Sequence, residues 1–188
     1  MIALAGIFVG GSGTRMGGCA KGLLRAPDGK ALVERTSTIL RDLGARAVLV
    51  GRAEAYERLR LEVVADEPPG IGPLGGLVAL LRRAGSSPVL ALACDMPFVS
   101  RALLGRLLAT APGAPIVAPR RQGRWEPLCA RYDAPRVLPL AAERARSVRH
   151  SLQSLLDASG AAEMPLSPRE AEDLRDWDSP EDMERTTP

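Results

Sequence analysis

A glycine-rich segment that carries two cationic side chains offers the clearest chemistry in this sequence. It follows the apolar run 2–9 and holds Arg15 and Lys21 among five glycines. Because glycine has no Cβ, backbone N–H groups in such a loop can curl around an anion and approach it closely. Arg15 and Lys21 would add positive charge at the same place. The combination predicts a binding site for a nucleoside triphosphate.

Lysine is rare in this chain, which makes Lys21 informative. The 25 basic residues include only two lysines, Lys21 and Lys30. Since the composition supplies arginine wherever a general positive charge is enough, a lysine inside the glycine loop indicates that a compact ammonium is needed there. The alternative is a chance position, as Lys30 in the turn 27–30 illustrates.

Two acidic residues follow other predicted strands. Asp95 comes just after the apolar run 89–93, and Asp66 opens the segment 66–76, which is rich in proline and glycine. In open α/β sheets, ligands collect beyond the carboxyl ends of the strands. Mg²⁺ usually binds one or two carboxylates together with phosphates and water. Asp95 is therefore the predicted ligand of Mg²⁺, with Mn²⁺ as an alternative ion, and Asp66 is a candidate nucleotide contact. The structural alternatives are a turn cap and an ordinary loop.

The glycine segment does not match two common nucleotide-binding fingerprints. The third glycine of the dinucleotide motif would fall at Met16, and Gly51 and Arg52 stand where an acidic residue would end the second strand. No glycine–lysine–Ser/Thr run exists, so the Walker A loop is excluded as well.

The C-terminal part holds more ambiguous residues. Asp178 is interpreted as the lead-in to a capping box over 179–182, with binding of metal or substrate by Asp176 or Asp178 as the alternative. His150 is the only histidine, and we expect it on the surface of a helical stretch. No histidine-based catalytic triad is therefore predicted.

Short apolar runs alternate with amphipathic helical stretches, which is typical of a parallel sheet covered by helices. The uninterrupted apolar run 89–93 predicts a central strand covered on both faces. The sequence predicts one domain over 1–188 with a three-layer α/β/α fold and a mostly parallel, Rossmann-like sheet of about six or seven strands. We expect 120–124 to be a loop. Strands are predicted at 2–9, 46–50, 61–65, 89–93, 116–118 and 128–132, and helices at 32–43, 74–83, 101–110, 134–158 in two pieces, and after 179.

Composition excludes several classes of partner. The net charge of +3 is mild, the arginines are scattered and only 3% of residues are aromatic, so nucleic-acid binding is not predicted. The three cysteines are far apart and odd in number, which predicts a reduced, cytoplasmic protein rather than a disulfide framework or a metal site. The first apolar run lacks a preceding basic segment, and no run is long enough to span a bilayer. We therefore expect neither a signal peptide nor membrane association.

Several motifs, in matching order, resemble those of the small nucleotidyltransferases that mature the molybdenum cofactor. Within this family, the Gly-Gly pair and Met16-Gly17 are similar to the guanylyltransferases rather than the cytidylyltransferases. Glu126-Pro127-Leu128 is the best agreement in the middle of the chain. The motifs are Gly10-Gly11-x-Gly13-x-Arg15-Met16-Gly17 followed by Lys21, then Gly72-Pro73-Leu74-Gly75-Gly76, Cys94-Asp95-Met96-Pro97 and Asp178-Ser179-Pro180-Glu181-Asp182.

The resemblance implies a fold of the nucleotide-diphospho-sugar transferase type and transfer of GMP from GTP to the terminal phosphate of molybdopterin, with release of pyrophosphate. It implies catalytic roles for Arg15, Lys21 and Asp95, with Lys21 facing Asp95 across a cleft that the Mg–triphosphate spans. Transient contacts with other cofactor-biosynthesis proteins or molybdoenzymes are also implied. The implied nucleotide-binding residues are Phe8, Val9, Gly10, Gly11, Ser12, Gly13, Lys21, Gly51, Asp66 and Asp95, and the candidates for holding the anionic pterin are Arg120, Arg121, Arg124 and Arg149.

Three departures from the family pattern leave alternatives open. Ala20 stands where the family usually has Asp, Gly51 stands where a polar nucleotide contact is common, and Asp176-x-Asp178 replaces Asn-x-Asn. The alternatives are a cytidylyltransferase, a sugar-1-phosphate nucleotidyltransferase, or a non-catalytic protein that binds GTP or cofactor and delivers it.

Overall fold

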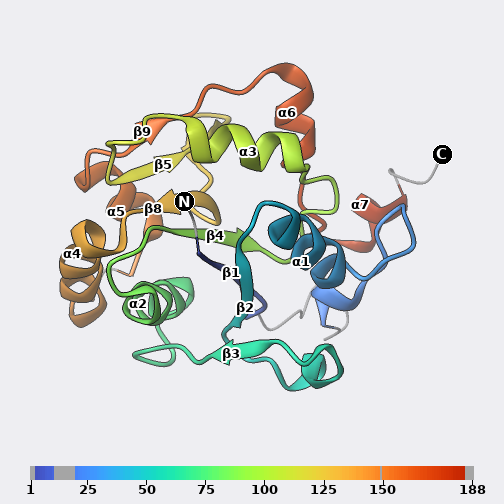
Figure 1. Ribbon diagram of the computed structural model, residues 1–188, viewed down its shortest axis with the longest axis horizontal. Helices are drawn as coiled ribbons and strands as arrows, with labels where there is room; N and C mark the ends of the chain where they lie inside the picture. Colours follow the sequence, from blue (N-terminus) through green and yellow to red (C-terminus); the bar gives the residue numbers. More distant parts are fainter. Residues whose placement is uncertain (1–2, 11–19, 149, 185–188) are drawn as a thin grey trace.

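A seven-stranded sheet runs through the middle of the molecule (Figure 1). The computed structural model describes residues 3–10, 20–148 and 150–184. The strand order is β3-β2-β1-β4-β8-β5-β9, and only β8 runs antiparallel to its neighbours. The predicted mostly parallel sheet is therefore confirmed. Its strands are β1 (Leu4–Phe8), β2 (Arg46–Val50), β3 (Glu62–Val64), β4 (Val89–Ala93), β5 (Ile116–Ala118), β8 (Cys129–Tyr132) and β9 (Ala162–Glu163).

Helices cover both faces of this sheet. Figure 1 shows α2, α4 and α5 on one side and α1 and α3 on the other. The two sides hold separate apolar cores, because successive strand residues point to opposite faces. The α-helices are α1 (Leu32–Asp42), α2 (Pro73–Ala84), α3 (Arg101–Ala109), α4 (Ala134–Arg146), α5 (Leu152–Ala158), α6 (Pro168–Asp173) and α7 (Pro180–Glu184), and η2 (Lys21–Leu23) and η3 (Glu54–Leu59) are 3₁₀-helices. No helix in the described part of the chain is both long and apolar enough to cross a membrane.

Strand β4 lies at the centre of the sheet, as its apolar run predicts. Val89 to Leu92 are fully buried, and the strand pairs with β1 on one side and β8 on the other. On the β1 side, Gly6 lets α2 approach closely, because a Cβ at this position would lie 2.6 Å from Leu80 Cδ2. The close contact fixes α2 against β1, and with it the loop that precedes α2.

A β-hairpin stands where the sequence analysis expects a loop at 120–124. Strands β6 (Arg120–Arg121) and β7 (Arg124–Trp125) pair antiparallel. Gln122 and Gly123 both have positive φ (51° and 77°), as the tightest hairpin turns require. The hairpin is held by Trp125, whose Nε1 donates to Asp157 Oδ1 at 2.8 Å. The loop prediction is therefore wrong for this segment.

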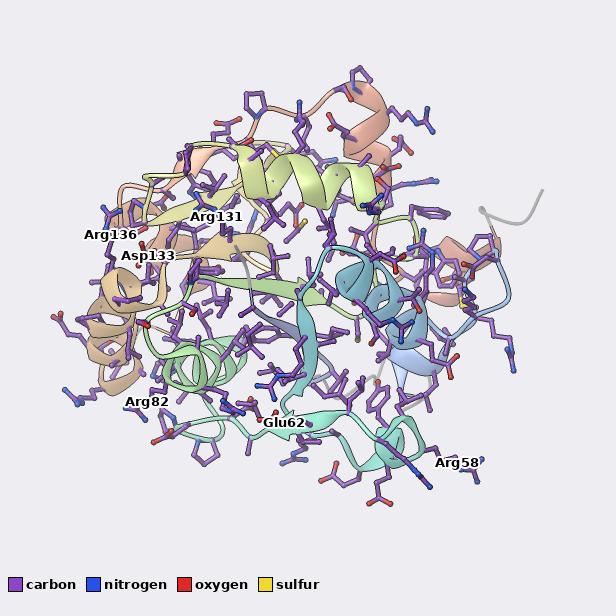
Figure 2. The ribbon with its side chains drawn as sticks, in the orientation of Figure 1. Arg58, Glu62, Arg82, Arg131, Asp133 and Arg136 are labelled. Atoms are coloured by element: carbon purple, nitrogen blue, oxygen red, sulfur yellow. The ribbon has the colours of Figure 1, made fainter. Side chains whose placement is uncertain are left out.

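The helical stretch predicted over 134–158 breaks between α4 and α5. His150 lies in this break, is half-buried and belongs to neither helix, so its predicted helical position is wrong. Ser151 accepts a hydrogen bond from the backbone of Ser154 and caps α5. Asp133 caps α4 in the same way, through the backbone N–H of Arg136, near the buried Arg131 (Figure 2).

An ion-pair triad ties the edge of the sheet to α2. Glu62 on β3, labelled in Figure 2, accepts hydrogen bonds from Arg46 Nη1 at 2.9 Å and from Arg83 Nε at 2.7 Å. The hydrogen bond from Arg83 is the main reason that the pKa of Glu62 falls below its ordinary value of 4.5. All three side chains are a third to half exposed, so water screens the triad.

Replacing this glutamate tests the triad. Because the folded-state pKa of Glu62 is lowered, its stabilisation is present above pH 4.5 and is lost as the pH falls through the folded pKa. We expect Glu62→Gln to lower the free energy of unfolding by about 0.5–1 kcal/mol at pH 7. The loss should be smaller at pH 3 than at pH 7 in urea titrations. A loss of the same size at both pH values would contradict this account. Glu143→Gln, at an exposed position of α4, is the control.

Candidate active site

The carboxyl ends of β1 and β4 bring the two halves of the predicted site together. Phe8 and Ala93 lie side by side in the parallel pair, and Cys94 N donates to Phe8 O at 3.2 Å. Val9 and Gly10 continue from β1 at the same edge, and Asp95 follows β4. The predicted residues Gly11, Ser12, Gly13, Arg15 and Arg149 lie outside the described residues.

The Lys21 ammonium lies between two carboxylates. Its Nζ donates to Asp95 Oδ2 at 3.0 Å and to Asp178 Oδ1 at 2.7 Å. The side chains of Lys21 and Asp95 are 20% and 19% exposed, whereas that of Asp178 is 54% exposed. The structure therefore brings Lys21 and Asp95 together, as the sequence analysis expects, but they are in direct contact rather than apart across an open cleft.

Burial and neighbouring charges oppose each other at this ion pair. Burial alone would lower the pKa of Lys21, but the hydrogen bonds to Asp178 and Asp95 outweigh it and raise this pKa. Burial raises the pKa of Asp95, and the charges of Asp176 and Asp178 add to this effect against the opposing contribution of Lys21. The ammonium thus stays charged, and the surplus of carboxylates favours a further cation.

A C-terminal segment, residues 175–179, crosses the end of β4. Trp177 N donates to Asp95 O at 2.9 Å, and the Trp177 indole is buried against the edge of Phe98 with ring centroids 6.3 Å apart. The two aspartates beside Trp177 bind different cations. Asp176 accepts from Arg121 Nη2 at 3.1 Å, and Asp178 binds Lys21.

At the start of α7, Asp182 makes one half of the predicted capping box. Ser179 Oγ and N both donate to Asp182 Oδ2, at 3.0 and 2.9 Å. The carboxylate of Asp178 accepts a hydrogen bond from Lys21 Nζ. Its backbone N–H donates to Asp182 Oδ2 at 3.1 Å, so Asp178 leads into the capped turn while its side chain binds Lys21. Its contact with metal or substrate stays a prediction.

A cavity of about 450 Å³ opens at the ends of β2 and β3. It is lined by Gly51, Arg52 and Asp66, among others. Burial raises the pKa of Asp66, and the nearby Arg52 partly offsets this rise. Gly51 has φ of 101°, and a Cβ there would lie 3.2 Å from Gly10 Cα. This close contact explains why the chain has glycine where a polar residue is common.

A second cavity, of about 240 Å³, opens at the ends of β4 and β8. Asp95, Arg121, Glu126 and Asp176 are among its lining residues. Glu126 lies in the short connection between β7 and β8, and the sequence predicts no role for it. Its signal was the run Glu126-Pro127-Leu128, in which an acidic residue precedes an apolar strand.

The predicted pterin-binding arginines are mostly engaged elsewhere. Arg121 Nε donates to Glu126 Oε1 at 2.8 Å, and Arg120 stacks on Trp125 at 3.9 Å. Arg124 is exposed on the hairpin. Of the candidates that the structure describes, only Arg121 lines either cavity.

The oxygen donors near Lys21 suit Mg²⁺ when phosphates complete its shell. Asp95 and Asp178 both reach the ammonium position, and Mg²⁺ commonly takes one or two carboxylates with phosphate and water oxygens. Within the described ranges, no group of three or more histidine, cysteine or acidic side chains could hold a metal by itself. The residues fit a metal that arrives with a triphosphate.

Comparison with known proteins identifies the family. Residues 5–161, well over half of the chain, match the family described as the MobA-like NTP transferase domain. The chain belongs to this family. It is 33% identical to a probable molybdenum cofactor guanylyltransferase of Opitutus terrae, over 97% of this chain and 94% of that protein. It is also 35% identical to a molybdenum cofactor guanylyltransferase of Pseudomonas putida, over 95% and 94% of the two chains.

Solved structures share the same fold. Molybdopterin-guanine dinucleotide biosynthesis protein A of Archaeoglobus fulgidus superposes with a TM-score of 0.79 at 23% identity, over 96% of this chain and 95% of that one. The 2-C-methyl-D-erythritol 4-phosphate cytidylyltransferase of Thermus thermophilus superposes with a TM-score of 0.69 at 19% identity, over 98% and 96%. The predicted family and the predicted nucleotidyltransferase fold are both confirmed.

The position of Asp178 predicts competition with bound phosphate. Because its carboxylate is one of the two that hold Lys21, Asp178→Asn should leave the ammonium with Asp95 alone. Binding of inorganic tripolyphosphate should then tighten roughly twofold to fivefold, as expected for one partly exposed charge pair. Isothermal titration calorimetry measures this change. The control is Asp42→Asn, which also removes one negative charge, at the exposed end of α1. Equal affinities in the two variants would contradict the prediction.

Proposed function

We propose that this protein transfers GMP from GTP to the terminal phosphate of molybdopterin and releases pyrophosphate. The observation that carries the proposal is the Lys21–Asp95 pair, whose aspartate lines the smaller cavity. It occurs in a chain whose relatives at 33% and 35% identity are named molybdenum cofactor guanylyltransferases. GTP and molybdopterin are the proposed substrates.

The strand order supports separate places for the two substrates. One cavity lies at the β2 and β3 ends, the other at the β4 and β8 ends, and β1 lies between them in the order β3-β2-β1-β4-β8. The larger cavity, which contains Asp66, suits the nucleoside of GTP. The acceptor would enter from the β4–β8 side. The phosphates of both would then meet near Lys21 and Asp95.

The reaction needs little chemistry from the protein itself. A terminal phosphate oxygen of the acceptor attacks the α-phosphorus of GTP in line, the bond from the α-phosphorus to the bridging oxygen breaks, and pyrophosphate leaves with the electron pair. The attacking oxygen is already anionic near neutral pH, so no histidine base and no covalent intermediate are required. Positioning and charge neutralisation supply the catalysis.

Lys21 is the residue that changes partners in this proposal. In the structure, it is held by Asp95 and Asp178. With GTP bound, the ammonium would move to the β- and γ-phosphates and stabilise the leaving group. Arg15 and the backbone N–H groups of Gly11 and Gly13 would add further donors, as their sequence positions predict.

Asp95 would hold Mg²⁺, with Asp178 as a second oxygen donor. The ion supplies neutralisation of the negative charge that accumulates on the phosphates during transfer. Departure of Lys21 from Asp95 frees one carboxylate oxygen for this role. Cytoplasmic location, the absence of nucleic-acid binding and contacts with other cofactor proteins stay predictions from the sequence.

The two lysines of the chain provide a matched test of the charge. We expect Lys21→Ala to lower the rate of transfer by roughly a hundredfold, because it removes a cation from the leaving group. Lys30→Ala removes an exposed ammonium in the turn before α1 and should leave the rate unchanged. Steady-state rates of pyrophosphate release measure both effects. Equal rates for the two variants would remove Lys21 from the mechanism.

One assay tests the proposed function directly. Purified protein is incubated with Mg²⁺, molybdopterin and either GTP or CTP, and released pyrophosphate is measured. We expect release with GTP and much less with CTP. Preference for CTP would identify a cytidylyltransferase, and activity only with sugar 1-phosphates would identify the third alternative. Binding of GTP without any release would favour a delivery protein.

A further inference from the structure

The smaller cavity has a composition that a phosphate-binding site would not have. Its walls include Ala93, Met96, Leu128 and Leu174, all apolar. Its volume of about 240 Å³ suits a flat two-ring heterocycle better than a complete nucleoside. The cavity begins directly beside Asp95, so an occupant would extend toward the proposed point of phosphate transfer.

The charges of this cavity are predominantly negative. Three carboxylates, those of Asp95, Glu126 and Asp176, line it together with a single guanidinium, that of Arg121. Arg121 already binds both Glu126 and Asp176. Because anionic groups would be repelled, the cavity favours a neutral ring that presents N–H donors.

Three hydrogen bonds hold Glu126 in the connection between β7 and β8. Its backbone N–H donates to Pro119 O at 2.9 Å, and its backbone carbonyl accepts from Cys129 N at 3.0 Å. Its Oε1 accepts from Arg121 Nε at 2.8 Å. No donor in the described part of the chain binds Oε2. Glu126 is therefore a largely buried carboxylate in the lining of the cavity, and one of its oxygens accepts no hydrogen bond from the described residues.

We propose that this cavity binds the pterin ring of the acceptor, with Glu126 accepting hydrogen bonds from its 2-amino group and adjacent ring N–H. A 2-amino-4-oxopteridine carries these two donors on one edge, which matches one carboxylate. Its flat rings would pack on the apolar walls. The inference rests on the proposed function, and it replaces the expectation that Arg120, Arg121 and Arg124 hold an anionic pterin. Arg121 instead orients Glu126.

Two pteridines that differ at this edge test the inference. Pterin carries the 2-amino group, whereas lumazine has a carbonyl oxygen there, which the carboxylate of Glu126 repels. Each is titrated into the full-length protein and followed by its own fluorescence. We expect the wild type to bind pterin roughly tenfold or more tightly than lumazine. Glu126→Gln should weaken pterin binding about tenfold and remove the discrimination.

Two further variants distinguish a loss of the Glu126 contact from a general loss of structure. Glu143→Gln makes the same chemical change at an exposed position of α4 and should behave as wild type. Ala93→Val adds methyl groups to the cavity wall without touching Glu126, and it should weaken pterin and lumazine alike. Thermal melting and far-UV circular dichroism establish that each variant is folded.

The outcomes separate this inference from the proposed function. Equal affinity of the wild type for pterin and lumazine, or full discrimination in Glu126→Gln, overturns the assignment of the cavity even if GMP transfer proceeds. A variant that loses GTP affinity instead of pterin affinity assigns the cavity to the nucleotide and also overturns it. Failure of the wild type to release pyrophosphate from GTP and molybdopterin overturns the function itself.

Discussion

The contact of Lys21 with Asp95 is the interaction around which the site is organised. An ammonium with two carboxylate partners, at 3.0 and 2.7 Å, occupies the place where phosphate and metal would meet. The pair neutralises a partly buried carboxylate, which limits the cost of that burial. It also keeps a cation next to the point of transfer. In the proposed mechanism, substrate binding would be an exchange of partners rather than the creation of new charge.

Sheet topology determines which residues can join this pair. β1 and β4 are parallel neighbours, so the segment after β1 and the Asp95 turn leave the same edge. β8 runs in the opposite direction beside β4, and it therefore brings its beginning, with Glu126, to that edge. The single reversed strand thus gives the site a second carboxylate-lined cavity. The C-terminal segment is attached to the same edge, because Trp177 N donates a hydrogen bond to Asp95 O.

The sequence was sufficient for much of this arrangement. Apolar runs predicted the strands near their observed bounds, and residues after β1 and β4 were expected to meet because parallel strands share an edge. Glu126 was not predicted, because the rule concerns residues that follow parallel strands. β8 is antiparallel to β4, so the residues that precede β8 lie at the same edge. The hairpin at 120–125 was missed because two-residue strands carry no periodicity. The contact of Asp178 with Lys21 joins residues 157 positions apart, which no local pattern reveals.

The most direct test of the central claim is a crystal structure with a non-hydrolysable GTP analogue and Mg²⁺. The account predicts that Lys21 Nζ lies within hydrogen-bond distance of a β- or γ-phosphate oxygen and has left Asp95, whose carboxylate binds the metal. A bound nucleotide with Lys21 still paired to both Asp95 and Asp178 would contradict it.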